Sequence, residues 1–138
     1  MPNARGVADT ADPESSLIDA GFARWRRLHR TASLALGLFA LTHSALTAHF
    51  YRSWGPDALW FLGSGLGLLL LAVMNVAHVG LDRCTMPTAP VVRAANWTFV
   101  IFGASALVAV PEPHVAVILV LLAVQAVGSQ YTLRADVR

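Results

Sequence analysis

A long uncharged stretch between two aspartates constrains this chain more than any other feature. Residues 58–81, which lie between Asp57 and Asp82, contain no Asp, Glu, Lys or Arg. At a rise of about 1.5 Å per residue, a helix over these residues would exceed the roughly 30 Å of a bilayer's hydrocarbon core. We therefore expect this stretch to cross a membrane as one helix.

The composition of the whole chain agrees with a membrane protein. Of its 138 residues, 56% are hydrophobic and 13% are charged, and the mean hydropathy is +0.57. A soluble domain would contain about 25% charged residues. The net charge of +2 does not indicate a nucleic-acid-binding protein, because the basic residues cluster at the predicted membrane boundaries rather than on one face. Cys84 is the only cysteine, which excludes an intrachain disulfide and a multi-cysteine metal site.

Three further apolar stretches complete an all-α integral membrane domain. The predicted four-transmembrane-helix bundle covers residues 31–138, with spans at about 31–50, 58–81, 94–110 and 114–131. Residues 1–12 are predicted to be a disordered tail. A cleaved signal peptide is the alternative interpretation of the first span, but residues 1–30, which include acidic residues, precede it and His43 interrupts it.

The segment before the first span is amphipathic. Asp12, Pro13 and Glu14 form a helix-start signal, and apolar residues then recur at three- and four-residue spacing opposite a group of arginines. Residues 13–30 are therefore predicted to form a cytoplasmic interfacial helix with Trp25 at the depth of the headgroups. The alternative is that these basic residues only mark the cytoplasmic end of the first span, with no helix docked at the interface.

The distribution of arginine predicts the orientation. Residues 24–30 (RWRRLHR), the second connection and the C-terminus contain most of the basic residues, whereas the first connection has only Arg52 and the third has none. Both termini are therefore expected to be cytoplasmic, in the inner membrane of a bacterium.

Five histidines suggest haem or metal binding, and depth in the membrane tests the pairs. Counted from the predicted span ends, His43 and His78 differ in depth by roughly 13 Å, so they cannot share one haem. His29 and His78 lie near one boundary, and His49 and His114 near the other. Either of these pairs is compatible with a haem or metal at the surface, or with simple hydration at the interface, and the cofactor is left unknown.

His43 is predicted to lie near the middle of the membrane. An ionisable residue at this depth suggests either small-molecule binding or a neutral ring that joins helices by a hydrogen bond. Ser105 falls at about the same depth on the third span and is a candidate partner, as is Thr47 one turn along the first span.

Four polar residues are predicted closer to the cytoplasm. Asn75 and Gln125 fall at similar depth, with Asn96 and His78 nearer the boundary. They would either line a vestibule that binds a small molecule or cross-link helices, with each amide contributing about 0.6 kcal/mol.

Small residues predict helix packing. Gly37 and Ser44 belong to a stripe on the first span, and Gly63 and Gly67 have GxxxG spacing on the second. One such surface would seal the first two spans and the other would meet a second protomer or a partner subunit.

Missing motifs argue against an enzyme. No acidic residue lies within a span, and the sequence has no HExxH pair, phosphate loop or motif that pairs a nucleophile with a base. We expect a protein that acts by helix association, as a homo-oligomer or as an accessory subunit. The alternatives are a carrier or binder of a small neutral or lipophilic molecule, and a redox subunit that binds haem or quinone.

Overall fold

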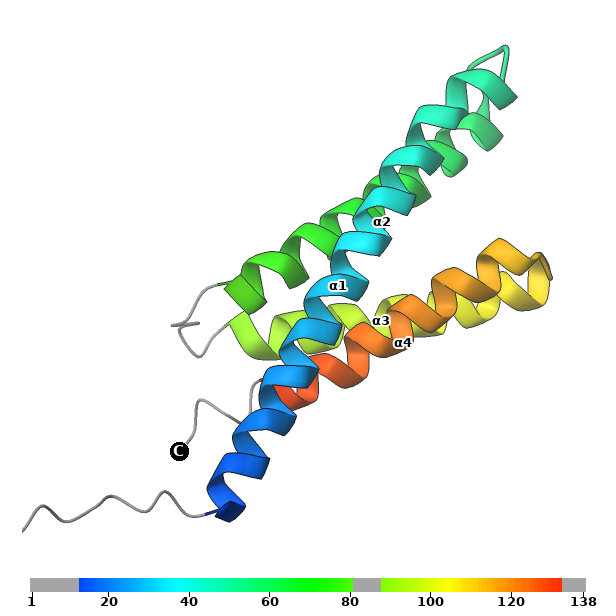
Figure 1. Ribbon diagram of the computed structural model, residues 1–138. Helices are drawn as coiled ribbons and strands as arrows, with labels where there is room; N and C mark the ends of the chain where they lie inside the picture. The colour runs from blue at the N-terminus through cyan, green and yellow to red at the C-terminus, as the bar shows by residue number, and fades with distance from the viewer. Residues whose placement is uncertain (1–12, 81–87, 133–138) are drawn as a thin grey trace, which may run out of the picture.

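The computed structural model describes residues 13–80 and 88–132, and it is all-helical (Figure 1). Its helices are α1 (Pro13–Phe50), α2 (Pro56–Gly80), α3 (Thr88–Ala109) and α4 (Pro113–Thr132). Each is long and apolar enough to cross a membrane. The predicted all-α arrangement of four span-length helices is confirmed. The predicted tail, residues 1–12, lies outside the described residues.

Prolines mark where three of these helices begin. Pro13, Pro56 and Pro113 are the first residues of α1, α2 and α4, where the fixed φ of proline suits the first turn and its missing N–H costs nothing. α3 starts at Thr88, whereas the predicted span starts near residue 94. Pro90 does not delay the start of the helix, because it lies in the first turn. A proline at that position is compatible with a helix, and polar side chains do not prevent one.

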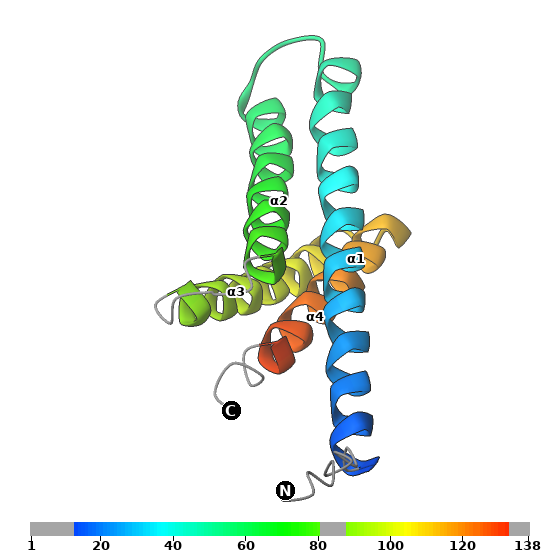
Figure 2. The ribbon, with the colours of Figure 1, turned by 60° about the vertical axis from the view of Figure 1, so that its left-hand side comes forward.

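Residues 13–30 and 31–50 form one uninterrupted helix. No proline occurs between residues 14 and 50, and the backbone continues through Arg30 and Thr31 without a turn. The segment predicted as a separate interfacial helix is therefore continuous with the first span. Its first turns extend past the end of α4 (Figures 1 and 2).

The four helices form two antiparallel hairpins. α1 pairs with α2 through the connection at residues 51–55, and α3 pairs with α4 through residues 110–112. α1 also packs on α4, whereas α2 and α3 contact each other at few residues. The hairpins meet near the ends of α2 and α4 and diverge toward the two connections (Figures 1 and 2). We call the end with the connections the turn end, and the opposite end the termini end.

The apolar core lies where the hairpins meet. Its buried members come from three helices and are Leu36, Ala40, Leu68, Leu71, Ala72 and Leu122. The outward faces are also apolar, with Leu38, Leu70 and Val108 each more than 65% exposed. The core therefore fixes only the crossing region and leaves the turn ends of the hairpins apart.

Candidate functional site

All four helices contribute buried polar residues close to this core. We call this group the polar junction, and its members are His29, Ser33, Asn75, His78, Asn96, Gln125 and Ser129. Six of them have no exposed surface and His78 is 8% exposed. Asn75, His78, Asn96 and Gln125, the four polar residues predicted in the cytoplasmic half of the spans, are thus all buried.

Hydrogen bonds connect three helices through Asn75. Its Oδ1 accepts from Nδ2 of Asn96 at 2.9 Å, and its Nδ2 donates to Oδ1 of Asn96 at 2.8 Å. Nε2 of His29 lies 2.8 Å from the same Oδ1 of Asn75. Because a carbonyl oxygen only accepts, Nε2 of His29 must carry the proton. α1, α2 and α3 are therefore joined by one side-chain network.

α4 approaches the network closely at a glycine. A Cβ added to Gly128 would lie 3.0 Å from Cβ and Cγ of His29, tighter than most contacts of real Cβ atoms. One turn further toward the termini end, the rings of Trp25 and Tyr131 stack with their centroids 4.8 Å apart. Gly128 therefore lets the imidazole of His29 lie against α4.

Two members of the junction have polar atoms without partners. Nδ1 of His29 and both amide atoms of Gln125 are buried and make no hydrogen bond within the described part of the chain. A buried polar group left unpaired costs about 1–3 kcal/mol. The Asn75–Asn96 pair thus acts as a cross-link between helices, and Gln125 does not.

The geometry does not fit a haem between His29 and His78. One ring nitrogen of His29 is bound to Asn75 and the other lies against Gly128, so neither is directed at a space for a planar ring. At the turn end, the ring of His49 packs edge-on against Phe50, while His114 is exposed at the start of α4. No group of three or more His, Cys, Asp or Glu in residues 13–80 and 88–132 is placed to hold a metal.

His43 is half-buried between α1 and α2 and does not meet its predicted partner. Its Nε2 lies 3.1 Å from the carbonyl oxygen of Phe61 and 3.2 Å from Oγ of Ser64, and its ring stacks on the ring of Phe61. Ser105 is instead exposed on α3 and donates to the carbonyl of Ile101. Thr47 is buried, and its hydroxyl has no partner among the described residues. Depth alone predicted the wrong partner, because Ser105 is on an exposed face of α3; His114 of α4 instead lines one hollow with His43 and Phe61.

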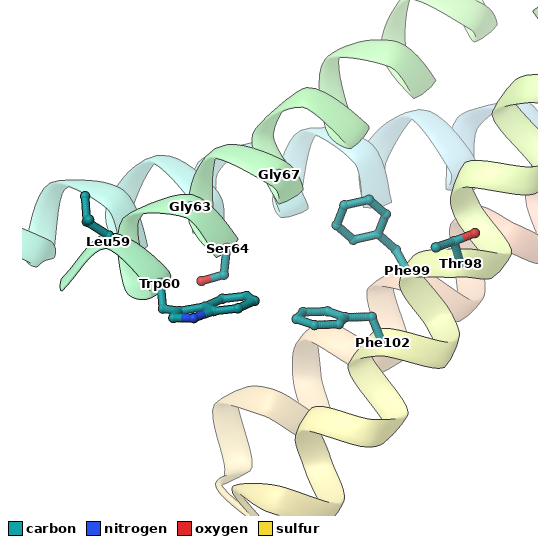
Figure 3. Close-up of a pocket in the computed structure, with 8 residues that line it drawn as sticks. All are labelled: Leu59, Trp60, Gly63, Ser64, Gly67, Thr98, Phe99 and Phe102. Atoms are coloured by element: carbon teal, nitrogen blue, oxygen red, sulfur yellow. The ribbon is translucent and has the colours of Figure 1, made fainter. Parts of the chain in front are cut away.

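An apolar wedge opens between α2 and α3. It has a volume of about 550 Å³ and is lined by Leu59, Trp60, Gly63, Ser64, Gly67, Thr98, Phe99 and Phe102. The rings of Phe99 and Phe102 project from α3 toward α2, and Trp60 borders the opening (Figure 3). The GxxxG residues Gly63 and Gly67 form the α2 side of this wedge.

The glycines of α2 have different surroundings. A Cβ at Gly65 would collide with Oγ of Ser44 and lie 3.2 Å from the backbone nitrogen of Ser44. A Cβ at Gly63 would meet no atom of the described chain within 4 Å, and one at Gly67 only the ring of Phe99. Gly37 faces Ala72 at 3.5 Å. Gly65, which the GxxxG spacing does not include, is therefore a position where α1 and α2 approach closely.

Three members of the polar junction were not predicted from the sequence. His29 was expected at a membrane boundary and not in the protein interior, and Ser33 and Ser129 were not predicted as site residues. The spacing of Gln125 and Ser129 at four residues was an available signal, since it places both on one face of α4.

Comparisons with known protein families, with functionally characterised proteins and with solved structures find no match to this chain.

Proposed function

We propose that this chain is a multi-pass membrane protein that acts by helix association, with the wedge between α2 and α3 as its docking surface. The observation that carries the proposal is the position of Gly63 and Gly67. They form a small-residue face on a span-length helix, and a Cβ at Gly63 would meet nothing in the described chain. Interfaces between membrane helices are rich in such residues because they let two backbones approach closely.

Apolar outward faces support insertion into a bilayer. Large side chains such as Leu38, Leu70 and Ile101 are exposed on different helices, and lipid would solvate them where water would not. The bias of arginine toward residues 24–30 supports an orientation with the termini end at the cytoplasm of a bacterium.

A second copy of the chain is the partner that the wedge favours. Across a two-fold axis, α2 of each copy would lie in the wedge of the other, so that the face with Gly63 and Gly67 meets itself. Phe99 and Phe102 would then flank the crossing point (Figure 3). An accessory subunit that docks a foreign helix at the same face is the other form of this proposal.

The molar mass of the purified protein in detergent tests this proposal. Wild-type protein should be a dimer or larger, and Gly63→Leu should be a monomer with unchanged helix content, because the leucine enters open space within its own chain. A monomeric wild type without a co-purifying subunit, or a Gly63→Leu protein of unchanged mass, would contradict it.

Binding of a small lipophilic molecule is a second candidate function. The wedge volume of about 550 Å³ is typical of a ligand pocket, and the hydroxyls of Ser64 and Thr98 border its aromatic lining. Native mass spectrometry should then detect a retained small molecule in wild-type protein that Gly63→Leu loses without any change in oligomeric mass.

A further inference from the structure

A basic pocket and an apolar groove follow one another along the same face of the α1/α2 hairpin. The basic pocket, of about 290 Å³, lies between Ala23, Arg26, Arg27 and Arg30 of α1 and Val79 of α2. The apolar groove, of about 500 Å³, continues toward the turn end from Ser33 and Leu34 to Leu41.

The spacing along both helices shows that the two hollows share one face. On α1, residues 23, 27, 30, 34, 37 and 41 recur at intervals of three and four and line either the pocket or the groove. On the antiparallel α2, residues 79, 76, 73 and 69 do the same. Positions three and four apart lie on one side of a helix, so the pocket opens at the end of the groove.

The arginines of the pocket have no acidic partner in the described chain. All three are exposed, and none makes an ion pair with a described residue. Of the acids whose side chains are described, Asp57 and Glu112 lie at the turn end, and Asp19 precedes Arg26 by about two turns. Guanidinium groups bind phosphate oxygens through paired N–H donors, so this pocket suits a phosphate-bearing anion.

The basic pocket and the groove together have the length of one leaflet. Arg30 and Leu41 are separated by about 16 Å along α1, which is half of the roughly 30 Å hydrocarbon core. Trp25, which stacks on Tyr131, directly precedes Arg26 of the basic pocket in the sequence, and aromatic residues of this kind concentrate at the level of the headgroups. One placement in the bilayer therefore puts the basic pocket at the depth of the headgroups and the groove at the depth of the acyl chains.

We propose that this face binds one anionic phospholipid, with its phosphate among Arg26, Arg27 and Arg30 and an acyl chain in the groove between α1 and α2. The site is separate from the wedge between α2 and α3 and does not depend on helix association. In the proposed orientation the lipid comes from the cytoplasmic leaflet, whose surface is negatively charged.

Lipid titration of the purified protein in detergent tests the charged part of this site. Dioleoylphosphatidylglycerol should bind more tightly than dioleoylphosphatidylcholine, with binding followed by native mass spectrometry and by the unfolding temperature. Each of Arg26→Gln, Arg27→Gln and Arg30→Gln should weaken phosphatidylglycerol binding by about fivefold. Arg24→Gln, an exposed arginine of the same segment outside the pocket, is the matched control and should not change binding.

Each other outcome of that titration overturns the proposal. Equal binding of the two lipids would remove the requirement for an anionic headgroup. An equal loss in Arg24→Gln would show general attraction to surface charge instead of a pocket. If inorganic phosphate or glycerol 3-phosphate stabilises the protein as much as the lipid does, the pocket binds a free phosphate.

A second variant tests the place of the acyl chain. Ala77 is exposed and lines the groove, so Ala77→Phe fills the groove without entering the core. It should weaken phosphatidylglycerol binding severalfold, whereas Ala104→Phe, at an exposed position of α3, should not. Equal binding by wild type and Ala77→Phe, both with unchanged helix content, would show that the lipid does not use the groove.

Discussion

At the residue scale, the polar junction contains side chains that join helices by hydrogen bonds, such as Asn75 and Asn96, and side chains that do not, such as Gln125. The sequence placed Asn75 and Gln125 at similar depth and Asn96 and His78 nearer the cytoplasm, because rise per residue is a reliable measure within straight helices. It could not show which amides pair, since that depends on the direction of each side chain across a crossing. His29 was placed at a membrane boundary because the first helix was assumed to enter the bilayer at Thr31.

The amide pair should be energetically coupled. Asn75→Leu removes the acceptor of His29 and both partners of Asn96, and should lower the free energy of unfolding by about 1–3 kcal/mol. Asn96→Leu should cost less, because His29 keeps its bond to Asn75. The double variant should be less destabilised than the sum of the two, by about 0.6–1.7 kcal/mol, in reversible unfolding in mixed detergent micelles. Additive effects would show that the pair contributes nothing.

His43 provides a test of structural against functional roles. His43→Gln keeps a donor within reach of the Phe61 carbonyl, and should retain the fold and any activity, whereas His43→Leu should lose about 0.6–1.7 kcal/mol of stability. For both variants, the free energy of unfolding is measured together with the cellular phenotype or the amount of retained ligand. A His43→Gln protein that is stable but has lost either one would assign His43 a titrating or binding role.

At the element scale, the sequence predicted the four span-length helices and most of their ends. Apolar length and the prolines at positions 56 and 113 determine α2 and α4 to within about two residues, the usual uncertainty of helix ends. The continuity of α1 was missed because a change from amphipathic to apolar sequence does not break a helix. The role of Gly65 was missed because a motif gives the spacing of glycines but not the face that they turn to a neighbour.

Two glycines two residues apart on α2 should respond differently to the same substitution. Gly65→Leu forces α1 away at Ser44 and should lower stability by about 1–3 kcal/mol. Gly63→Leu should leave the unfolding of the isolated protomer nearly unchanged, because its side chain enters open space. Both are measured by unfolding in detergent at a concentration that keeps the protein monomeric. Equal effects would contradict the assignment of Gly65 to the helix contact.

At the scale of the whole molecule, two hairpins meet at one end and leave a wedge at the other. Composition predicted the helical class, but not the divergence of the hairpins. That divergence depends on where the bulky and polar residues of the crossing fall, with the amide network and the core confined to one region. Ser105 and His43, which share a predicted depth, have separate partners because Ser105 is on an exposed face of α3.

The orientation of the chain can be tested with reporter fusions. A reporter after Arg138 should be active only as a cytoplasmic protein, and reporters at Gly55 and Glu112 only as periplasmic ones, because the arginine-rich segments favour the cytoplasmic side. A periplasmic signal after Arg138, together with periplasmic signals at Gly55 and Glu112, would show that α4 does not cross the membrane and would contradict the arrangement of four spans.

Disulfide cross-linking in native membranes tests helix association most directly. With Cys84→Ser as background, Gly63→Cys should form a disulfide-linked dimer on mild oxidation, because closely packed helices bring Cα atoms within the roughly 4.4–6.8 Å that a disulfide spans. Val120→Cys, at an exposed position seven residues into α4 just as Gly63 is seven residues into α2, is the control and should remain monomeric. The account predicts dimers for Gly63→Cys alone. The absence of any cross-linked product for Gly63→Cys, or equal dimer yields for both variants, would contradict it.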